Sequence, residues 1–387
     1  MERTNSLPTM RHKDVMREPS VVLAGGGTAG HISPMLAIAD AVARLAPGAR
    51  QTMIGTEVGL ETRLVPDAGY ELETIDKVPM PRRPSRDLLK FPGRFSGAVK
   101  AAEQIIRGRE ADVVIGVGGY VSTPVYVAAK RAGVPVVLHE ANARPGMANR
   151  LGSRFAAFSG VAYEGTALKG AEWVGMPMSR EISQLDRAEE QAAARERLGL
   201  EPERTTLVVT GGSSGALSLN RAVSAALEEL LATGAQVLHL TGRDKAVLDE
   251  AGEPITTDGY HQREYLDGMQ TAYAAADLIV ARAGAATVCE VAAVGLPAVY
   301  VPLPIGNGEQ ELNARELVDA GGALLVKDEH FTKPWISRNI VPLLKDPRLL
   351  LTMEKHAAER GITDADERMA RAALRAAGHH PDQEAAE

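Results

Sequence analysis

Short apolar runs rich in β-branched residues recur along the chain, and each precedes a turn and then a segment with apolar residues at helical spacing. Ser20–Ala24, for example, runs into three glycines, and Ile32–Leu45 follows with this helical pattern. Strands that are apolar throughout and are joined by helices indicate a parallel sheet that is covered on both faces. The alternation therefore predicts an α/β fold built on parallel sheets.

The pattern occurs in two series, which predicts two domains. A chain of 387 residues suits two domains of roughly 150 to 200 residues each, and two cores imply a cleft between them. The strands expected in the first domain are Ser20–Ala24, Gln51–Ile54, Asp112–Val117 and Val134–His139. Those expected in the second are Thr205–Thr210, Gln236–Leu240, Asp277–Ala281, Ala298–Val301 and Ala323–Val326, with a helix over 216–232.

The boundary between the domains is expected near Trp173–Pro177, a stretch with Gly and Pro that leads into the charged, alanine-rich segment Leu185–Leu200. A strong helical pattern follows the last strand and suits a helix that packs back on the first domain. The predicted parts are a polar N-terminal arm over 1–18, a first domain over 19–176, a second domain over 177–360, a returning helix over 361–377 and a disordered tail over 378–387.

The composition excludes several classes of protein. A single cysteine, Cys289, rules out internal disulfides and sites with several thiolates, and it fits a reducing compartment. No run reaches the roughly 20 apolar residues of a membrane span, and Met1–Ser20 is polar and mixed in charge, unlike a signal peptide. A formal net charge of −7 argues against nucleic-acid binding. We therefore expect a cytosolic globular protein that does not bind nucleic acid.

The turn Gly25–His31 follows the first expected strand and opens a helix. Turns of this kind place backbone N–H groups and a helix N-terminus where an anion can bind. The turn fits Gly-x-Gly-x-x-Gly poorly, and no acidic residue ends Gln51–Ile54 to hold a ribose, which argues against a dehydrogenase. No Gly-Lys-Ser/Thr is present, so a P-loop is excluded. The alternative is a tight turn needed only for packing.

His31 lies at the start of this helix, where the positive end of the helix dipole disfavours the imidazolium form. A neutral imidazole can accept a proton, which makes His31 a candidate general base for an acceptor hydroxyl. The alternative is a capping or hydrogen-bonded structural histidine.

Four further loops follow expected strands. Gly116–Tyr120 and His139–Gly146 belong to the first domain, and Gly211–Gly215 and Arg282–Glu290 to the second. Ligands of open parallel sheets bind at the carboxyl ends of the strands, so these loops are expected to converge on one site. The two in the second domain each open a helix, and two helix N-termini suit a diphosphate.

Two groups in the second domain suit the rest of a nucleotide-activated sugar. Glu290 can accept two hydroxyls of a ribose, and Gly306–Gln310 offers amide and carboxylate groups to a polar sugar ring. The alternative for Glu290 is a carboxylate that stabilises its own helix. If the second domain holds the donor, the glycines of Gly25–His31 are expected to hold an acceptor diphosphate.

Five motifs make the interpretation specific: GGGTAGHISP, GVGGY, HEANARPG, GGSSGA and ARAGAATVCEVAAVGLP. In this order and spacing they resemble the MurG family, GT-B glycosyltransferases that make lipid II in peptidoglycan synthesis. The resemblance spans roughly Val21–Ala377. It implies two Rossmann-like domains whose parallel sheets face each other across a cleft, with the acceptor and the membrane on the first domain and the UDP-sugar on the second.

The resemblance also implies a reaction and a set of residues. The reaction is inverting transfer of N-acetylglucosamine from UDP-N-acetylglucosamine to lipid I, the undecaprenyl-diphosphate-linked N-acetylmuramoyl-pentapeptide. His31 is the implied catalytic residue, and Asn149 is expected near the acceptor. The implied donor contacts are Thr28, Ala29, Gly30, Asn142, Ser213, Leu266, Ala285, Ala286, Thr287, Val288, Cys289, Glu290 and Gln310.

Three positions depart from the family pattern. Ala29 stands where the family usually has glycine, and Ala141 where it usually has glutamine. Ser179 stands at the position of the arginine that contacts the diphosphate in the family. We hypothesise that Arg180, one residue on, takes the place of that arginine.

A basic and apolar segment, Pro79–Phe95, suits an anionic membrane surface. Residues 82–94 carry a net charge of +4, and apolar side chains interleave with the basic ones. Anionic lipid attracts such segments by about 1 kcal/mol per basic residue. Pro92 is expected in the first turn of a helix. The predicted contacts are Arg82, Arg83, Leu88, Leu89 and Phe91. An ordinary solvated helix start is the alternative to peripheral binding at the cytoplasmic side of the cell membrane.

No metal site is expected, because the one Asp-x-Asp, Asp364–Asp366, lies in a charged helical segment rather than after a strand. No cofactor is expected to be tightly bound, although a divalent cation can stimulate transfer, and helix N-termini are expected to stabilise the leaving UDP. The expected partners are UDP-N-acetylglucosamine, lipid I, an anionic membrane surface and proteins of cell-wall synthesis and division.

Other readings stay open at this point. The chain can be another GT-B glycosyltransferase with a lipid or natural-product acceptor, or a nucleotide-sugar epimerase. It can also be a catalytically silent module that binds a UDP-sugar or a lipid.

Overall fold

Strand β1 (Ser20–Ala24) shows why the strands of this chain are apolar throughout. Val22 and Ala24 pack into the hydrophobic cluster on one face of the first sheet, whereas Val21 and Leu23 pack into the cluster on the other face. Successive side chains of a strand point to opposite faces, so a strand covered on both sides needs apolar residues at every position.

The structure is a computed structural model, and it describes residues 17–78, 86–305 and 307–380. Most of the predicted N-terminal arm (1–16) lies outside the described residues, and so do residues 381–387 of the predicted tail.

Within these ranges the first sheet has seven parallel strands in the order β3-β2-β1-β4-β5-β6-β7. Besides β1 they are β2 (Arg50–Gly55), β3 (Glu71–Thr74), β4 (Val113–Gly116), β5 (Val136–Glu140), β6 (Phe158–Val161) and β7 (Glu172–Trp173). The helices of this domain are α1 (Ala29–Leu45), α2 (Glu61–Asp67), α3 (Arg86–Gly108), α4 (Ser122–Ala132) and α5 (Met147–Gly152). The strand order reverses between β1 and β4, which places a crevice beside the turn that follows β1.

The second sheet has six parallel strands in the described part of the chain, in the order β10-β9-β8-β11-β12-β13. They are β8 (Thr206–Thr210), β9 (Gln236–Leu240), β10 (Tyr260–Arg263), β11 (Leu278–Ala281), β12 (Ala298–Tyr300) and β13 (Ala323–Leu325). The helices are α6 (Arg180–Ser183), α7 (Arg187–Arg197), α8 (Leu217–Ala225), α9 (Leu227–Leu231), α10 (Met269–Ala275), α11 (Ala285–Ala293), α12 (Glu309–Asp319), the 3₁₀ helix η1 (Asp328–His330), α13 (Lys333–Lys345) and α14 (Pro347–Ala358). The order reverses between β8 and β11, so the loops after these two strands border the second crevice.

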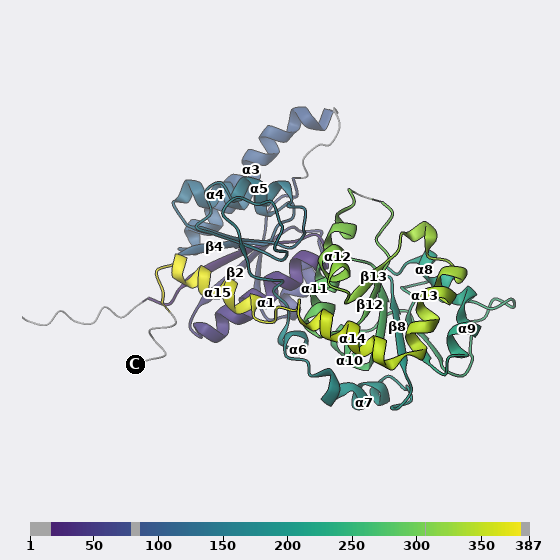
Figure 1. Cartoon of the computed structure of the whole chain (residues 1–387). Coiled ribbons are helices and arrows are strands. Elements are labelled where there is room, and N and C mark those ends of the chain that lie inside the picture. The colour runs from purple at the N-terminus through teal and green to yellow at the C-terminus, as the bar shows by residue number, and fades with distance from the viewer. Residues whose placement is uncertain (1–16, 79–85, 306, 381–387) are drawn as a thin grey trace, which may run out of the picture.

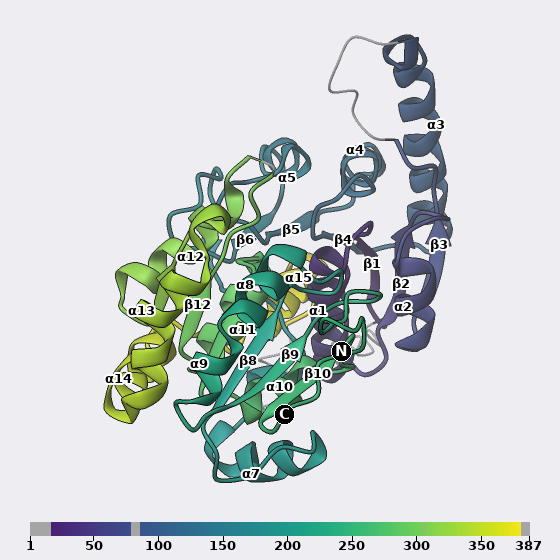
Figure 2. The same cartoon turned by 90° about the vertical axis from the view of Figure 1, so that its right-hand side faces the viewer.

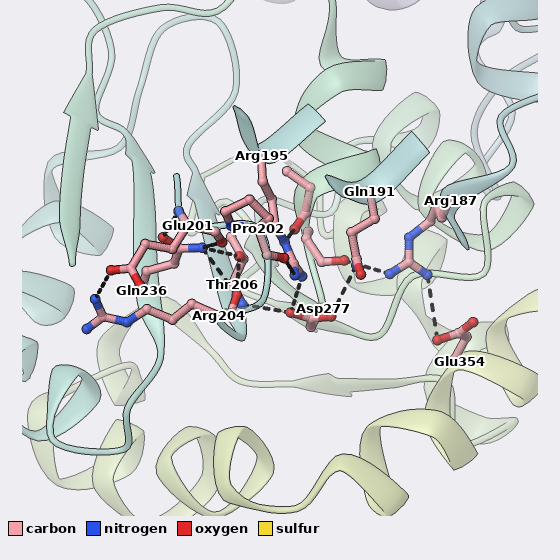
Figure 3. Close-up of polar contacts among 12 residues, drawn as sticks. Arg187, Gln191, Arg195, Glu201, Pro202, Arg204, Thr206, Gln236, Asp277 and Glu354 are labelled. Atoms are coloured by element: carbon pink, nitrogen blue, oxygen red, sulfur yellow. Dashed lines mark hydrogen bonds and ion pairs between the residues drawn. The ribbon is translucent and has the colours of Figure 1, made fainter. Parts of the chain in front are cut away.

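Two buried arginines fasten α7 to the second domain (Figure 3). Arg187 donates to three backbone carbonyls of that domain. Arg195 pairs with Asp277 at 2.7 Å between Nη2 and Oδ2, and the same oxygen accepts the N–H of Thr206 at the start of β8. These contacts make helix α7 part of the second domain.

The chain crosses back after α14, and α15 (Ala365–Ala376) packs on the first domain, as Figure 1 shows for the yellow helix beside α1. Met369, Ala373 and Leu374 are buried against α1 and the first sheet. Arg44 at the end of α1 pairs with the buried Asp366 at 2.7 Å. The domain limits at 176/177 and 360/361 stay predictions.

The predicted fold class is confirmed: two Rossmann-like α/β domains with parallel sheets are present. The single helix expected over 216–232 is wrong, because the backbone leaves the helical region at Ala226 (φ −101°, ψ 2°) and separates α8 from α9. Pro92 is the seventh residue of α3 and not in its first turn. Among the described residues, no helix is long and apolar enough to cross a membrane.

Candidate functional site

The turn after β1 leaves the N-terminus of α1 open. Thr28 is the residue that precedes α1, and its backbone is extended (φ −138°, ψ 155°). Its side chain makes no hydrogen bond to the N–H groups of the first turn. The Thr28 hydroxyl instead lies 3.1 Å from Nδ1 of His31. The N–H groups at the start of α1 are thus available to a ligand, and Thr28 orients the histidine.

His31 is half-buried against the loop that follows β4. A Cβ atom at Gly118, where φ is +95°, would lie 3.3 Å from His31 Nε2, so the ring rests against a backbone without a side chain. Burial lowers the pKa of His31 below its usual value, and the charges of Glu140 and Glu309 partly offset this effect. In the tautomer that donates from Nδ1 to Thr28, Nε2 keeps a lone pair that can accept a proton.

Glu140, the last residue of β5, organises the loop that follows it. Its carboxylate accepts the N–H of Asn142 at 3.0 Å, the N–H of Gly146 at 2.9 Å and the side-chain amide of Asn149 at 2.9 Å. Sequence reasoning did not name Glu140 as a site residue, although it stands in the quoted motif HEANARPG. The signal that could have found it is a carboxylate at a strand exit.

Asn149 is buried, with 2% of its surface exposed. Its Nδ2 donates to the carbonyl of His139 as well as to Glu140, and its Oδ1 accepts from the hydroxyl of Tyr126 at 2.8 Å. Both amide hydrogens are therefore used inside the first domain. The contact of Asn149 with an acceptor stays a prediction, and the geometry gives this residue an orienting role.

Asn313 of α12 joins the two domains. Its Oδ1 accepts the N–H of Ala143 at 3.0 Å, and its Nδ2 lies 3.5 Å from Oδ1 of Asn142 and 3.4 Å from the carbonyl of Ala283. Asn142, one of the implied donor contacts, is thereby held next to the loop that opens α11. Sequence reasoning missed Asn313, because it lies 170 positions from Ala143 in the chain.

The loop Gly211–Gly215 after β8 is supported from the loop that follows β9. Gly215 (φ +64°) and Gly242 (φ +92°) pack backbone to backbone, and a side chain on either would overlap the other loop. Lys245 Nζ donates to the carbonyl of Ser214 at 2.5 Å and to that of Gly215 at 3.3 Å. Ser213 is exposed at the tip. The lysine turns these carbonyls towards itself and adds a positive charge beside the loop.

Helix α11 also begins without a side-chain cap, because Gly284 precedes it. Ala285, Ala286 and Thr287 in its first turn are partly exposed, so their N–H groups face an accessible surface. Together with the loop before α8, this second uncapped helix start gives the second domain two groups of N–H donors for an anion.

Deeper in α11 the residues turn towards the domain junction. Val288 and Cys289 line a cavity of about 30 Å³ together with Tyr163 of the first domain. Burial raises the pKa of the Cys289 thiol to about 12, so the thiol stays protonated and is a poor nucleophile. The contacts of Val288 and Cys289 with the donor stay predictions.

Glu290 accepts a hydrogen bond from the hydroxyl of Tyr273 at 2.7 Å, and burial raises the pKa of Glu290. Gln310 accepts the N–H of Leu303 at 2.9 Å and so fixes the loop after β12. Leu266 packs against the hydrophobic cluster that includes residues of α10 and α11.

Ser179 and Arg180 are exposed at the start of α6, a helix that packs against α11.

The predicted membrane segment is described only in part. Arg82 and Arg83 lie outside the described residues, and Leu88 and Leu89 lie in α3 with side chains that are not described. Phe91 stacks on Phe95 with ring centroids 5.6 Å apart, and both pack against the first core, so Phe91 is only half-exposed. Figure 2 shows the start of α3 projecting beyond the rest of the first domain.

Among the described residues, no group of three or more His, Cys, Asp and Glu side chains is arranged to hold a metal ion. Asp366 of the Asp-x-Asp motif forms an ion pair with Arg44 at the end of α1.

Comparison with known proteins places both domains in one group. Residues 21–159 match the glycosyltransferase family 28 N-terminal domain, and residues 206–369 match the glycosyltransferase family 28 C-terminal domain. A curated relative from Paenarthrobacter aurescens is 58% identical over 357 residues, covering 92% of this chain and 96% of the relative. A relative from Nocardioides sp. is 54% identical, covering 92% and 97%. Both are named UDP-N-acetylglucosamine–N-acetylmuramyl-(pentapeptide) pyrophosphoryl-undecaprenol N-acetylglucosamine transferase.

Two solved structures agree with the fold. MurG from Acinetobacter baumannii is 27% identical with a TM-score of 0.75, covering 92% of this chain and 99% of that one. The UDP-GlcNAc 2-epimerase from Neisseria meningitidis is 14% identical with a TM-score of 0.65, covering 92% and 100%. At that identity the epimerase shows a shared fold alone.

Proposed function

Since the chain belongs to glycosyltransferase family 28, we propose that it transfers N-acetylglucosamine from UDP-N-acetylglucosamine to lipid I and so forms lipid II. One observation carries this proposal best. His31 in the first domain, with Nε2 able to accept a proton, is affected by the charge of Glu309 at the start of α12 in the second domain. Asn313 of the same helix connects the first domain to the loop before the open N-terminus of α11. A base on one wall and an anion site on the other are what transfer from a nucleotide sugar requires.

The donor diphosphate binds at the N-termini of α8 and α11, where fixed N–H dipoles stabilise the charge that develops on the leaving UDP. Glu290 accepts the ribose hydroxyls. Arg180 supplies the positive charge that Ser179 lacks, so Arg180→Ala should weaken UDP binding. An unchanged dissociation constant for UDP would rule this role out.

In the transfer step, His31 Nε2 takes the proton of the acceptor hydroxyl. The hydroxyl oxygen forms a bond to the anomeric carbon from the face opposite the diphosphate, and the bond from that carbon to the diphosphate oxygen breaks. UDP leaves with the electron pair, so the configuration of the anomeric carbon inverts.

His31→Ala tests this assignment. Loss of a general base lowers kcat by about 10²–10⁴, whereas the affinity for UDP should be unchanged because UDP binds on the second domain. His330→Ala is the matched control, since that histidine is exposed on η1. A variant that loses thermal stability but keeps the kcat of the folded fraction would show that His31 is structural.

We also propose that the chain binds peripherally to the cytoplasmic side of the cell membrane, where lipid I and proteins of cell-wall synthesis and division are its partners. The basic segment that precedes and opens α3 supports this proposal. No cofactor is tightly bound, and a divalent cation that stimulates transfer acts on the diphosphate of the substrates.

A further inference from the structure

We propose that Glu61 is a positioning residue whose carboxylate takes the place of an anionic ligand in the turn after β1 and thereby holds Thr28 and His31 in position. The inference rests on the proposed function only in taking His31 as the general base. The hydrogen bonds of Glu61 do not depend on that function.

The Glu61 side chain is completely buried at the start of α2. Its Oε2 accepts the N–H of Gly27 at 3.0 Å, and its Oε1 accepts the N–H of Thr56 at 2.9 Å and the hydroxyl of Thr56 at 2.8 Å. Both oxygens are thus satisfied by donors from two different loops. A buried carboxylate with this set of donors is a built anion site, filled by the protein itself.

Three glycines make room for this carboxylate. A Cβ atom on Gly26, Gly55 or Gly59 would lie closer than 3.0 Å to the Glu61 side chain. These glycines come from the turn after β1, the end of β2 and the loop before α2. The lack of side chains at all three positions therefore makes room for the buried Glu61 side chain.

The carboxylate also carries its charge at neutral pH. Burial raises the pKa of Glu61, but the hydrogen bonds from Gly27 and Thr56 outweigh burial, and the pKa lies below its usual value. A negative charge fixed behind the turn repels a second anion at the same N–H group.

The position of Gly27 connects Glu61 to the base. Gly27 has φ +90°, and it directly precedes Thr28, whose hydroxyl meets His31 Nδ1. Because the N–H of Gly27 points at Glu61, the expected acceptor diphosphate does not find this donor free. The N–H groups left for it are those of the first turn of α1, at Ala29 and Gly30.

Glu61→Gln tests the inference with little change in volume. The amide retains one acceptor oxygen, so it presents an NH₂ group either to Gly27 or to Thr56. The oxygen that faces Thr56 accepts two hydrogen bonds, from the N–H and from the hydroxyl, whereas the oxygen that faces Gly27 accepts one. The amide oxygen is therefore expected to stay at Thr56, and the NH₂ group then faces the N–H of Gly27, which can only donate. Two donors therefore face each other at Gly27, the hydrogen bond from Gly27 is lost, and the turn after β1 is no longer held in place.

Thr56→Val is the matched control, because it removes one donor to the same carboxylate on the side away from the turn. We expect Glu61→Gln to lower kcat at least tenfold and Thr56→Val at most threefold, at similar losses in Tm and with UDP affinity unchanged in both. Equal losses of kcat in the two variants, or an unchanged kcat in Glu61→Gln, would overturn the inference.

A second readout does not depend on activity. In histidine-labelled protein, the ring resonances of His31, assigned with His31→Ala, should shift in Glu61→Gln but not in Thr56→Val, while those of the buried His239 stay in place. Unmoved His31 resonances would contradict the role of Glu61 even if the wild-type chain proved inactive towards lipid I. A wild-type chain without lipid I-dependent transfer would instead count against the proposed function.

Discussion

At the scale of single residues, buried carboxylates order the loops of the candidate site. Glu140 orders the loop from Asn142 to Asn149 through three hydrogen bonds, and its charge acts on His31. Burial alone would push the pKa of His31 further down, and Glu140 and Glu309 limit that shift. The protonation state of the base is therefore set by groups on both domains.

This arrangement predicts a pH effect. A base must be neutral to act, so activity should fall as the pH drops through the pKa of His31, which lies below the usual value for histidine. Glu309→Gln and Glu140→Gln each remove a charge that raises this pKa, so the acidic limb of kcat/KM should move to lower pH, further for Glu140→Gln. Glu329→Gln, a remote control, should leave the profile in place. An acidic limb that stays fixed or moves to higher pH would contradict the assignment of His31.

The loops that carry the candidate site could be predicted from the sequence, because glycines and polar residues at strand exits are local patterns. Glu61, Asn313 and Lys245 could not, because each acts on a loop far away in the chain. Glu61 is 34 residues from Gly27, and nothing in its local sequence marks its carboxylate as buried.

At the scale of elements, most of the strands that were predicted are buried along their whole length, such as β1 and β8. The strands that were missed are β3 (ELET), β6 (FSGV), β7 (EW) and β10 (YHQR), and all of them except β6 lie at an edge of a sheet. Edge strands are more exposed to solvent and contain polar residues, so their sequences lack the continuous apolar run that predicts a strand. Helix α3 is amphipathic and packs on α4, and its N-terminal end projects beyond the rest of the first domain (Figure 2).

The projecting end of α3 predicts salt-sensitive membrane binding. A variant with Arg82, Arg83, Arg86, Lys90 and Arg94 changed to Gln should float less with liposomes that contain anionic phosphatidylglycerol, and 0.5 M salt should release the wild type. A matched variant with five exposed basic residues of the second domain changed to Gln is the control. If flotation changed neither with the loss of these five basic residues nor with salt, the proposed membrane role of this segment would be wrong.

At the scale of the whole molecule, polar contacts join the two domains beside an apolar cluster that both domains share. Asn313 links the Ala143 loop to the Ala283 loop, and the hydroxyl of Tyr163 donates to the carbonyl of Ala285 at 3.2 Å. The first contact holds a loop of one domain against the helix start that is proposed to bind the diphosphate. The contact between the domains and the proposed donor site are therefore coupled.

Asn313→Asp tests this coupling. Aspartate still accepts the N–H of Ala143, but its second oxygen faces the oxygens of Asn142 and Ala283, so an attraction becomes a repulsion. An unsatisfied buried group of this kind costs about 1–3 kcal/mol, and we expect kcat/KM to fall about tenfold and the radius of gyration in the presence of UDP to rise. Asn339→Asp makes the same chemical change inside α13, where Asn339 donates to Trp335, and should alter neither quantity. A closed, fully active Asn313→Asp variant would show that the contact is incidental.

The central claim is that this chain moves N-acetylglucosamine from its UDP donor to a lipid-linked acceptor. The most direct measurement incubates the purified chain with radiolabelled UDP-N-acetylglucosamine, with and without lipid I, and follows both released UDP and labelled lipid. The account predicts that UDP appears only when lipid I is present and that label enters lipid II in equal amount. UDP released without lipid I, an epimerised UDP-sugar, or donor binding with no turnover in the presence of lipid I would contradict it.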